Sequence, residues 1–219
     1  SLPGDGVRRL CYAGTVVHAN PAGVLDSRVP EKAGAEIFGA ASLAADAEVV
    51  ALLLEVLRVN EVASSVLVLG HMGIYQSLTA PLALPPDVER QLFAAVQNKS
   101  ETDIAELLGR RTETRHLVRL PMLMGRHDQL GEARRALAGA PPGVERALDA
   151  LEWLAARVAG LDAPVEVRFD LAELAGYGYH NGPVFSAYQP AQGSAIARGG
   201  RYDGIGAAFG RARPATGFD

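Results

Sequence analysis

The stretch IARGGRYDGIGAAFG (Ile196–Gly210) places five glycines within fifteen residues, with Arg201, Tyr202 and Asp203 among them. Glycine-rich turns often cradle phosphates with their backbone amides. A dinucleotide-binding turn needs a glycine or an alanine where Phe209 stands, and a helix after it. A P-loop needs Lys followed by Ser or Thr after the glycines, and no such pair follows. The stretch therefore predicts a tight bend beside a sheet edge, where glycines let backbones approach closely.

The segments on either side of this bend carry strand patterns. Residues 164–174 (PVEVRFDLAEL) alternate apolar and charged side chains, as a strand with one solvated face does. Residues 182–190 and 194–204 predict a hairpin. Near the other end, residues 8–19 and 35–40 predict an antiparallel pair with a long connection, and residues 64–71 predict a buried strand.

Helical patterns fill much of the remaining chain. Ser42 is a candidate cap for a helix that includes AEVVALLLEVLRV (47–59), whose wide apolar surface favours packing on a sheet. Residues from about 72 to 160 show short helical patterns separated by turns, without strand signals. We therefore predict an α+β fold: an antiparallel sheet flanked by helices, in a single domain over 1–219 with a helical insertion at about 72–160.

Composition places the chain among globular proteins. Apolar residues make up 48% and charged residues 21%, and the net charge of −4 argues against non-specific nucleic-acid binding. Cys11 is the single cysteine, which excludes an internal disulfide and a thiolate metal cluster. The apolar runs are about half the length of a membrane span, and no secretory leader opens the sequence. We expect a cytoplasmic protein.

The residues alone give few candidates for chemistry. The five histidines are scattered without metal-ligand spacing, and no Gly-x-Ser-x-Gly elbow is present. Cys11 is expected to be an inert buried thiol, and Trp153 a core residue. Asp46 and Glu48 fall near a helix start, where the helix dipole accounts for acidic residues.

Four segments, in order along the chain, resemble the histidyl-tRNA synthetases. RLCYAGTVVHANPAGVLDSRVPEKAGAEIFG (9–39) is similar to their motif 2 region, and DAEVVALLLEVL (46–57) to the helix that follows it. YHNGPVFSAY (179–188) is similar to their second histidine-binding motif, and GGRYDGIGAAFGRARPATGF (199–218) to the segment running into motif 3. The resemblance implies a class II aminoacyl-tRNA synthetase-like fold.

Departures from this resemblance bear on activity. Motif 2 of the family has an arginine at the position of His18 and a glutamate at that of Asn20, which together hold ATP and the acyl-adenylate. A second family arginine, facing the reacting phosphate, is replaced by Ala175, and the loop after motif 2, basic in the family, carries Asp26. A mostly neutral histidine lacks the permanent charge and donor fork of arginine. Each lost group costs about 3–4 kcal/mol of transition-state stabilisation, so we expect no adenylate formation.

With GHMGIYQSLTAPLALPPDVERQLFAAVQNK (70–99), this pattern resembles the synthetase-like paralogues that serve as regulatory subunits of ATP phosphoribosyltransferase. The resemblance implies a non-catalytic chain without cofactor or metal. Its partner is the short-form catalytic subunit, in a hetero-oligomer for the first step of L-histidine biosynthesis with L-histidine as effector. No nucleic acid or membrane is implied. Family members carry motif 1 before Arg8 and continue past Phe218, so we expect a fragment that lacks motif 1 and the C-terminal end.

The resemblance also implies a remnant histidine-binding pocket, with tentative members Glu36, Tyr179, His180, Arg201 and Tyr202. In this hypothesis Glu36 accepts the ammonium group, and the rings of Tyr179 and Tyr202 flank an imidazole. Lys32, which stands where the synthetases have glutamine, would repel a cation. An ion pair of Arg201 with Asp203 or another neighbour is an equal alternative to ligand binding for that arginine.

Two other functions stay open. The chain could be a divergent histidyl-tRNA synthetase-like enzyme or an amino-acid ligase, although His18, Asn20 and Ala175 argue against it. It could also be a module that binds RNA or protein through the fold alone, and the acidic balance argues against RNA. Histidine-dependent pyrophosphate exchange tests the first, and co-purification with a phosphoribosyltransferase separates the second from a regulatory subunit.

Overall fold

A computed structural model describes residues 6–19, 27–62, 65–109, 114–161, 163, 165–174, 176, 178–190, 194–210 and 212–219. Within them, eight strands form one sheet in the order β1-β2-β8-β7-β6-β3-β5-β4. The strands are β1 (Arg8–Thr15), β2 (Glu31–Phe38), β3 (Ser65–His71), β4 (Met124–Arg126), β5 (Val165–Asp170), β6 (Pro183–Tyr188), β7 (Ala195–Arg201) and β8 (Ala215–Phe218). Helices flank this sheet, which confirms the predicted α+β, synthetase-like architecture.

Neighbouring strands are antiparallel except for β3 and β5, which pair in parallel from Ser65↔Val165 to Leu69↔Phe169. A parallel pair needs a long crossover, and the helical segment between β3 and β5 provides it. The predicted β1–β2 pair and the β6–β7 hairpin are both present.

The helices of the described chain are α1 (Leu43–Val59), α2 (Met72–Thr79), α3 (Pro86–Gln97), α4 (Glu101–Leu108), α5 (Arg115–Arg119), α6 (Leu130–Ala136) and α7 (Pro142–Ala159). Short 3₁₀ turns are Ala80–Leu82, Leu120–Met122, His127–Gln129 and Ile205–Phe209. Six of the helices lie in the stretch where helical patterns were predicted. That stretch also contains β4, a strand of three residues, too short to show alternation in the sequence.

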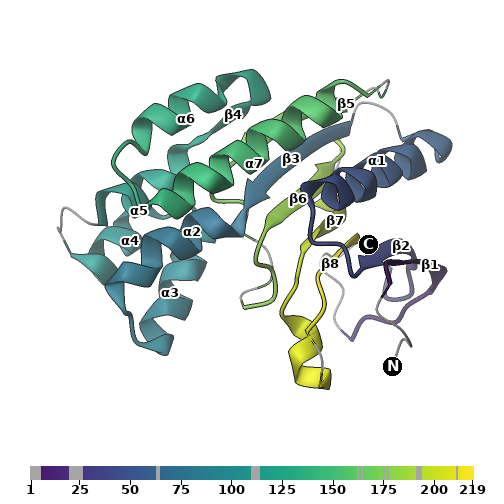
Figure 1. The fold of residues 1–219 in the computed structure, drawn as a ribbon, viewed down its shortest axis with the longest axis horizontal. Helices are drawn as coiled ribbons and strands as arrows, with labels where there is room; N and C mark the ends of the chain where they lie inside the picture. Colours follow the sequence, from purple (N-terminus) through teal and green to yellow (C-terminus); the bar gives the residue numbers. More distant parts are fainter. Residues whose placement is uncertain are drawn as a thin grey trace.

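Helices α1 and α7 lie side by side across one face of the sheet, while α2 to α6 gather toward the end away from β1 and β2 (Figure 1). Side chains alternate between faces along a strand, so Ile37 packs toward α1 and its neighbour Glu36 points to the opposite face. We call this opposite face of β2, β8 and β7 the open face. Four of the five predicted ligand residues are gathered on it.

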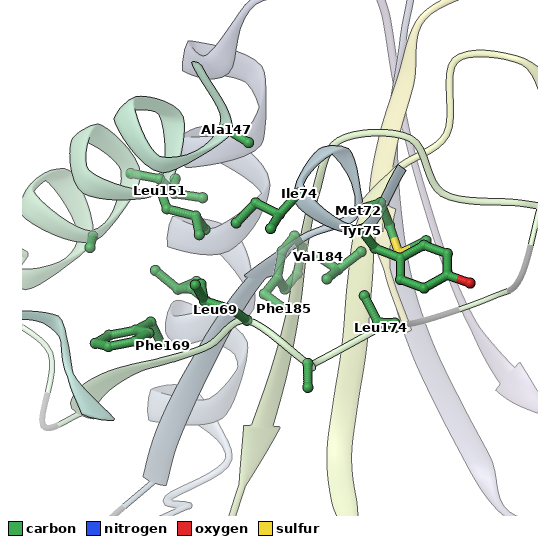
Figure 2. Packing of buried hydrophobic residues seen from close by; sticks show 14 of the residues in the cluster. Leu69, Met72, Ile74, Tyr75, Ala147, Leu151, Phe169, Leu174, Val184 and Phe185 are labelled. Atoms are coloured by element: carbon green, nitrogen blue, oxygen red, sulfur yellow. The ribbon is translucent and has the colours of Figure 1, made fainter. Parts of the chain in front are cut away.

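Buried apolar side chains join β3, β5 and β6 to the helices. Leu69, Ile74, Leu151 and Phe185 meet between the sheet and the helices α2 and α7 (Figure 2). Helix α7 buries one stripe at helical spacing, with members Val144, Ala147, Leu148, Leu151, Leu154, Ala155 and Val158. Trp153 lies off this stripe and is 44% exposed, so the prediction that it is a core residue is wrong.

Strand β1 is exposed along its whole length because it forms an edge of the sheet and pairs only with β2 in the described chain. Cys11 on this strand is exposed, so the prediction of a buried thiol is wrong. An ion pair between Arg9 and Glu48 connects β1 to helix α1. Among the described residues, no helix has the length and apolar character needed to cross a membrane.

Candidate functional site

Four of the five predicted ligand residues lie together on the open face: Glu36, Tyr179, His180 and Tyr202, which we call the Glu36 cluster. The hydroxyl of Tyr202 donates a hydrogen bond to Oε2 of Glu36. The rings of Tyr179 and Tyr202 stack with centroids 4.8 Å apart and planes inclined by 22°. His180 stands edge-on to Tyr179, with 4.8 Å between ring centroids. The cluster combines one carboxylate with three flat rings.

Glycines in neighbouring strands make room for these side chains. Glu36 pairs with Gly217 of β8, and Gly217 pairs with Gly200 of β7. A Cβ atom at Gly217 would overlap the Glu36 carboxylate, and one at Gly200 would lie 2.9 Å from Nδ1 of His180. The glycines of this region therefore accommodate the protein's own side chains on the open face. A 3₁₀ turn follows β7, without the α-helix that a dinucleotide-binding turn requires.

The ionisation of the cluster follows from burial and charge. Burial raises the pKa of Glu36, the charge of Asp219 adds to this, and the hydrogen bond from Tyr202 opposes it. Burial also raises the pKa of Tyr202, as does its bond to Glu36. Tyr202 therefore keeps its proton as the donor, and Glu36 is the acceptor. A ligand that brings an N–H donor or a positive charge is favoured beside these carboxyl groups.

Two residues near the Glu36 cluster, Asp219 and Tyr12, were not among the predicted ligand residues. Asp219 forms an ion pair with Lys32, whose Nζ lies 2.6 Å from Oδ2. This pairing offsets the cation repulsion predicted for Lys32. Tyr12 of β1 lies over Gly34, and burial together with the charges of Asp219 and Glu36 raises its pKa. A glycine inside a strand signals close approach, so Gly34 was the available sequence signal for this neighbour.

Arg201 lies apart from the Glu36 cluster, because its guanidinium points to the helix side of the sheet. Nε and Nη2 donate to Oδ2 of Asp46 at 3.1 and 2.9 Å, and Nη2 also donates to Ser42 O at 3.0 Å. Nη1 donates to Ala40 O and to Oδ1 of Asp203, each at 3.1 Å. These bonds use all five N–H donors of the side chain. Of the two alternatives left open by the sequence, this geometry favours the ion pair.

Of the positions where the family has its catalytic groups, the structure describes only His18. His18 lines a groove of about 690 Å³ that also contains Lys32, Arg198 and Asp219. Asn20, Asp26 and Ala175 lie outside the described residues. Within the described part of the chain, no three His, Cys, Asp or Glu side chains are grouped to hold a metal ion. The Glu36 cluster itself offers one carboxylate acceptor and the surfaces of three rings.

Comparisons with known proteins identify the family of the chain. A family model described as histidyl-tRNA synthetase matches residues 1–219. An "ATP phosphoribosyltransferase regulatory subunit" of Pseudomonas aeruginosa (strain LESB58) is 47% identical over 220 residues, covering the whole of this chain and 56% of the relative. A protein of the same name from Thioalkalivibrio sulfidiphilus (strain HL-EbGR7) is 48% identical over 222 residues, with the same coverage. The chain thus spans just over half the length of these curated relatives.

Solved structures give the same result. One is the crystal structure of an "ATP phosphoribosyltransferase regulatory subunit/histidyl-tRNA synthetase" from Bacillus halodurans C. It superimposes on this chain with a TM-score of 0.82 at 27% identity, covering 96% of this chain and 55% of that one. An ATP phosphoribosyltransferase complex from Thermotoga maritima gives a TM-score of 0.73 at 16% identity, covering 99% of this chain and 73% of that one, and it shows the fold alone. The fold, the cluster on its open face and the full-length family match together establish that this chain belongs to the histidyl-tRNA synthetase family.

Proposed function

We propose that the protein containing this chain is a non-catalytic regulatory subunit of ATP phosphoribosyltransferase. It is needed for the activity of the short catalytic subunit in the first step of L-histidine biosynthesis, and L-histidine acts on it as feedback effector. One observation carries the proposal: the Tyr202–Glu36 hydrogen bond and the stacked Tyr179 hold the residues of the proposed ligand site together, while His18 stands where the family has a catalytic arginine. Relatives at 47–48% identity that bear the regulatory name support it.

Histidine suits the chemistry of the Glu36 cluster. The carboxylate of Glu36 accepts an N–H or ammonium donor, and the nearby Asp219 strengthens the preference for a positive group. The faces and edges of Tyr179 and Tyr202 suit a flat imidazole ring. The burial of Glu36 strengthens a hydrogen bond to the ligand relative to one in water.

The same surroundings are poorly suited to phosphate chemistry. A developing phosphate charge requires fixed cations, and removing one such group costs about 3–4 kcal/mol of transition-state stabilisation. Arg201 uses its five donors within the protein, and Lys32 is paired with Asp219. His18 is a poor substitute for a permanently charged arginine. We therefore assign binding and allosteric coupling to this fold, with no group transfer.

The regulatory mechanism we propose is differential binding. Two states of a hetero-oligomer with the short catalytic subunit bind histidine with different affinity, and each ligand biases the same equilibrium. We place this assembly in the cytoplasm, since the sequence has a single cysteine and no disulfide framework.

The decisive experiment measures phosphoribosyltransferase activity of the short catalytic subunit, with and without the full-length protein, across a histidine titration. We expect activity to depend on the full-length protein and to fall as histidine increases. Failure to bind or stimulate the catalytic subunit contradicts the proposal. Histidine-dependent pyrophosphate exchange by the full-length protein alone also contradicts it, and supports an amino-acid-activating enzyme.

A matched pair of variants tests whether the Glu36 cluster is the effector site. Glu36→Gln removes the charge of the proposed acceptor, whereas Glu31→Gln removes a charge at an exposed position of the same strand. We expect Glu36→Gln to raise the histidine concentration needed for inhibition by about tenfold or more, because hydrogen bonds to charged groups are worth about 1.5–3 kcal/mol. Glu31→Gln should leave inhibition unchanged. Equal inhibition of both variants would place the effector elsewhere.

A further inference from the structure

A second polar pocket lies beside the Glu36 cluster, with a volume of about 390 Å³. Its polar side chains come from separate parts of the fold. Glu173 follows β5, Tyr188 ends β6, Arg198 lies within β7, and Gln97 ends α3. His180 lines this pocket and belongs to the Glu36 cluster, so the two sites adjoin at its ring.

A carboxylate, a guanidinium and a tyrosine hydroxyl line this pocket. Oε1 of Glu173 accepts hydrogen bonds from Ser186 Oγ at 2.7 Å and from Tyr188 Oη at 3.5 Å. Burial and the charge of Glu173 raise the pKa of the same Tyr188 hydroxyl, and the nearby guanidinium of Arg198 opposes them. In the part of the chain that the structure describes, no ion pair joins Glu173 to Arg198. The carboxylate and the guanidinium thus line the same pocket near Tyr188 without forming an ion pair with each other.

This arrangement is complementary to a zwitterion. A guanidinium binds a carboxylate through two parallel N–H donors, and a carboxylate accepts from an ammonium group. Both hydroxyl bonds to Glu173 end on Oε1, and a carboxylate has acceptor capacity on both oxygens. We infer that the Glu173–Arg198 pocket binds the main-chain groups of a free α-amino acid, with its ammonium at Glu173 and its carboxylate at Arg198.

The ring of His180 connects this pocket to the Glu36 cluster, because it lines the pocket and stands edge-on to Tyr179 and Tyr202. Nδ1 of His180 lies 3.2 Å from the carbonyl oxygen of Arg201, which can only accept, so Nδ1 carries the hydrogen. Burial lowers the pKa of His180, which keeps the ring neutral, with Nε2 free to accept from a ligand donor. An amino acid whose side chain carries an N–H donor, as histidine does, then contacts both sites. This assignment rests on the proposed function in taking histidine as the ligand.

The bonds of Glu173 to Ser186 and Tyr188 could instead serve only to hold the turn after β5 against β6. A holding role predicts that Glu173 and Arg198 affect stability alone. If Glu173 and Arg198 recognise a ligand, replacing either residue lowers the affinity only for ligands that carry the main-chain group which that residue binds. Ligands that lack one group at a time therefore separate the two roles.

The test is calorimetric titration of the full-length protein with L-histidine, with histamine, which lacks the carboxylate, and with imidazolepropionate, which lacks the ammonium. We expect Arg198→Gln to weaken L-histidine binding about tenfold and to leave histamine affinity unchanged. We expect Glu173→Gln to weaken L-histidine binding similarly and to leave imidazolepropionate affinity unchanged. Arg168→Gln and Glu166→Gln are matched controls, because these residues form an exposed pair on β5. Both should leave all three affinities unchanged.

Each other outcome of the titrations overturns the inference in a recognisable way. Unchanged L-histidine binding in both variants, or an equal loss for all three ligands, removes the main-chain groups from this pocket while the proposed regulation stands. Absence of L-histidine binding to the wild-type protein overturns it together with the effector site. Loss of activation of the catalytic subunit is read in a separate assay and contradicts the proposed function alone. Urea unfolding of each variant shows whether a loss of binding reflects a loss of folding.

Discussion

Asp46, in the first turn of α1, and Arg201, the last residue of β7, form a buried ion pair with 2.9 Å between Oδ2 and Nη2. Asp46 is 0% exposed and Arg201 is 5% exposed. The next residue, Tyr202, donates to Glu36 on the other face of the sheet. The pair therefore fixes the end of the strand that carries the ligand cluster against the helix that covers the sheet.

Replacing Asp46 with alanine should strongly destabilise the protein. The variant removes the fully buried counter-charge of the Arg201 guanidinium and leaves only the partly exposed Asp203 as its ion-pair partner. Breaking a buried pair costs up to about 3–5 kcal/mol. We expect this loss in the free energy of unfolding, measured by urea titration with circular dichroism. Glu55→Gln is the control, because Glu55 pairs with Arg58 at the exposed surface, where a pair contributes about 0–1 kcal/mol.

A double variant tests whether the destabilisation comes from leaving one buried charge without its partner. Asp46→Ala combined with Arg201→Met removes both buried charges, so it should be less destabilised than the sum of the two single variants. Strict additivity of the two losses would mean that the charges act independently, and would contradict the pair as the anchor of β7.

Replacing Gly217 with alanine should disrupt the Glu36 cluster. The added methyl group overlaps the Glu36 carboxylate, which must move and thereby give up its bond from Tyr202. Overpacking of this kind costs about 1–3 kcal/mol of folding free energy, and histidine-dependent inhibition should weaken with it. Gly204→Ala is the matched control, because a Cβ atom there meets nothing within 4 Å. Its effect on unfolding should stay within about 0.5 kcal/mol.

Strand patterns and the family motifs predicted most of the sheet, because alternation along β5 and the order of the motifs are local properties of the sequence. The burial of a strand depends on what lies across from it. Cys11 has apolar neighbours in sequence, yet β1 is an exposed edge strand. Trp153 shows the same limit for a helix, because its large apolar ring favours burial while its position lies off the buried stripe of α7.

The Glu36 cluster could be predicted only in part. The resemblance identified Glu36 and Tyr202, which lie 166 positions apart in the sequence and share a hydrogen bond. It gave no sign that Asp46 takes the guanidinium of Arg201 to the other side of the sheet. The helix dipole already accounts for an acidic residue such as Asp46 near a helix start. The sequence around Asp46 therefore does not indicate that its partner is a buried arginine of β7. Contacts between side chains of elements far apart in the sequence, such as Asp46 with Arg201, can be identified only from the three-dimensional structure.

Trp153 and Leu154 are neighbours on α7 that differ in solvent exposure, and one substitution at each position tests this difference. Trp153 is 44% exposed, so Trp153→Gln should change the free energy of unfolding by no more than about 0.5 kcal/mol. Leu154 is fully buried, so Leu154→Ala should cost about 2–5 kcal/mol through lost burial and the cavity left behind. A larger cost for the tryptophan variant than for the leucine variant would contradict the orientation of α7 on the sheet.

Acid should destabilise the protein through His71, which ends β3 and caps α2. Its Nδ1 accepts the backbone N–H of Gly73 at 3.0 Å, and this requires the neutral ring. Burial, with a contribution from the charge of Arg201, lowers the pKa of His71 from 6.5 to about 4. The unfolded chain therefore binds this proton more tightly than the folded protein. The stabilisation is complete above the unfolded pKa and is lost as the pH falls from there toward 4.

The His71→Asn variant isolates this contribution from the carboxyl groups that titrate in the same range. Asparagine offers a capping oxygen without a titrating ring. We expect the wild type to lose about 3 kcal/mol more unfolding free energy than the variant between pH 7 and pH 4. Urea titrations at several pH values measure the difference directly. If the gap between the two proteins stayed constant with pH, His71 would not be buried as a neutral cap, and the start of α2 would need another acceptor.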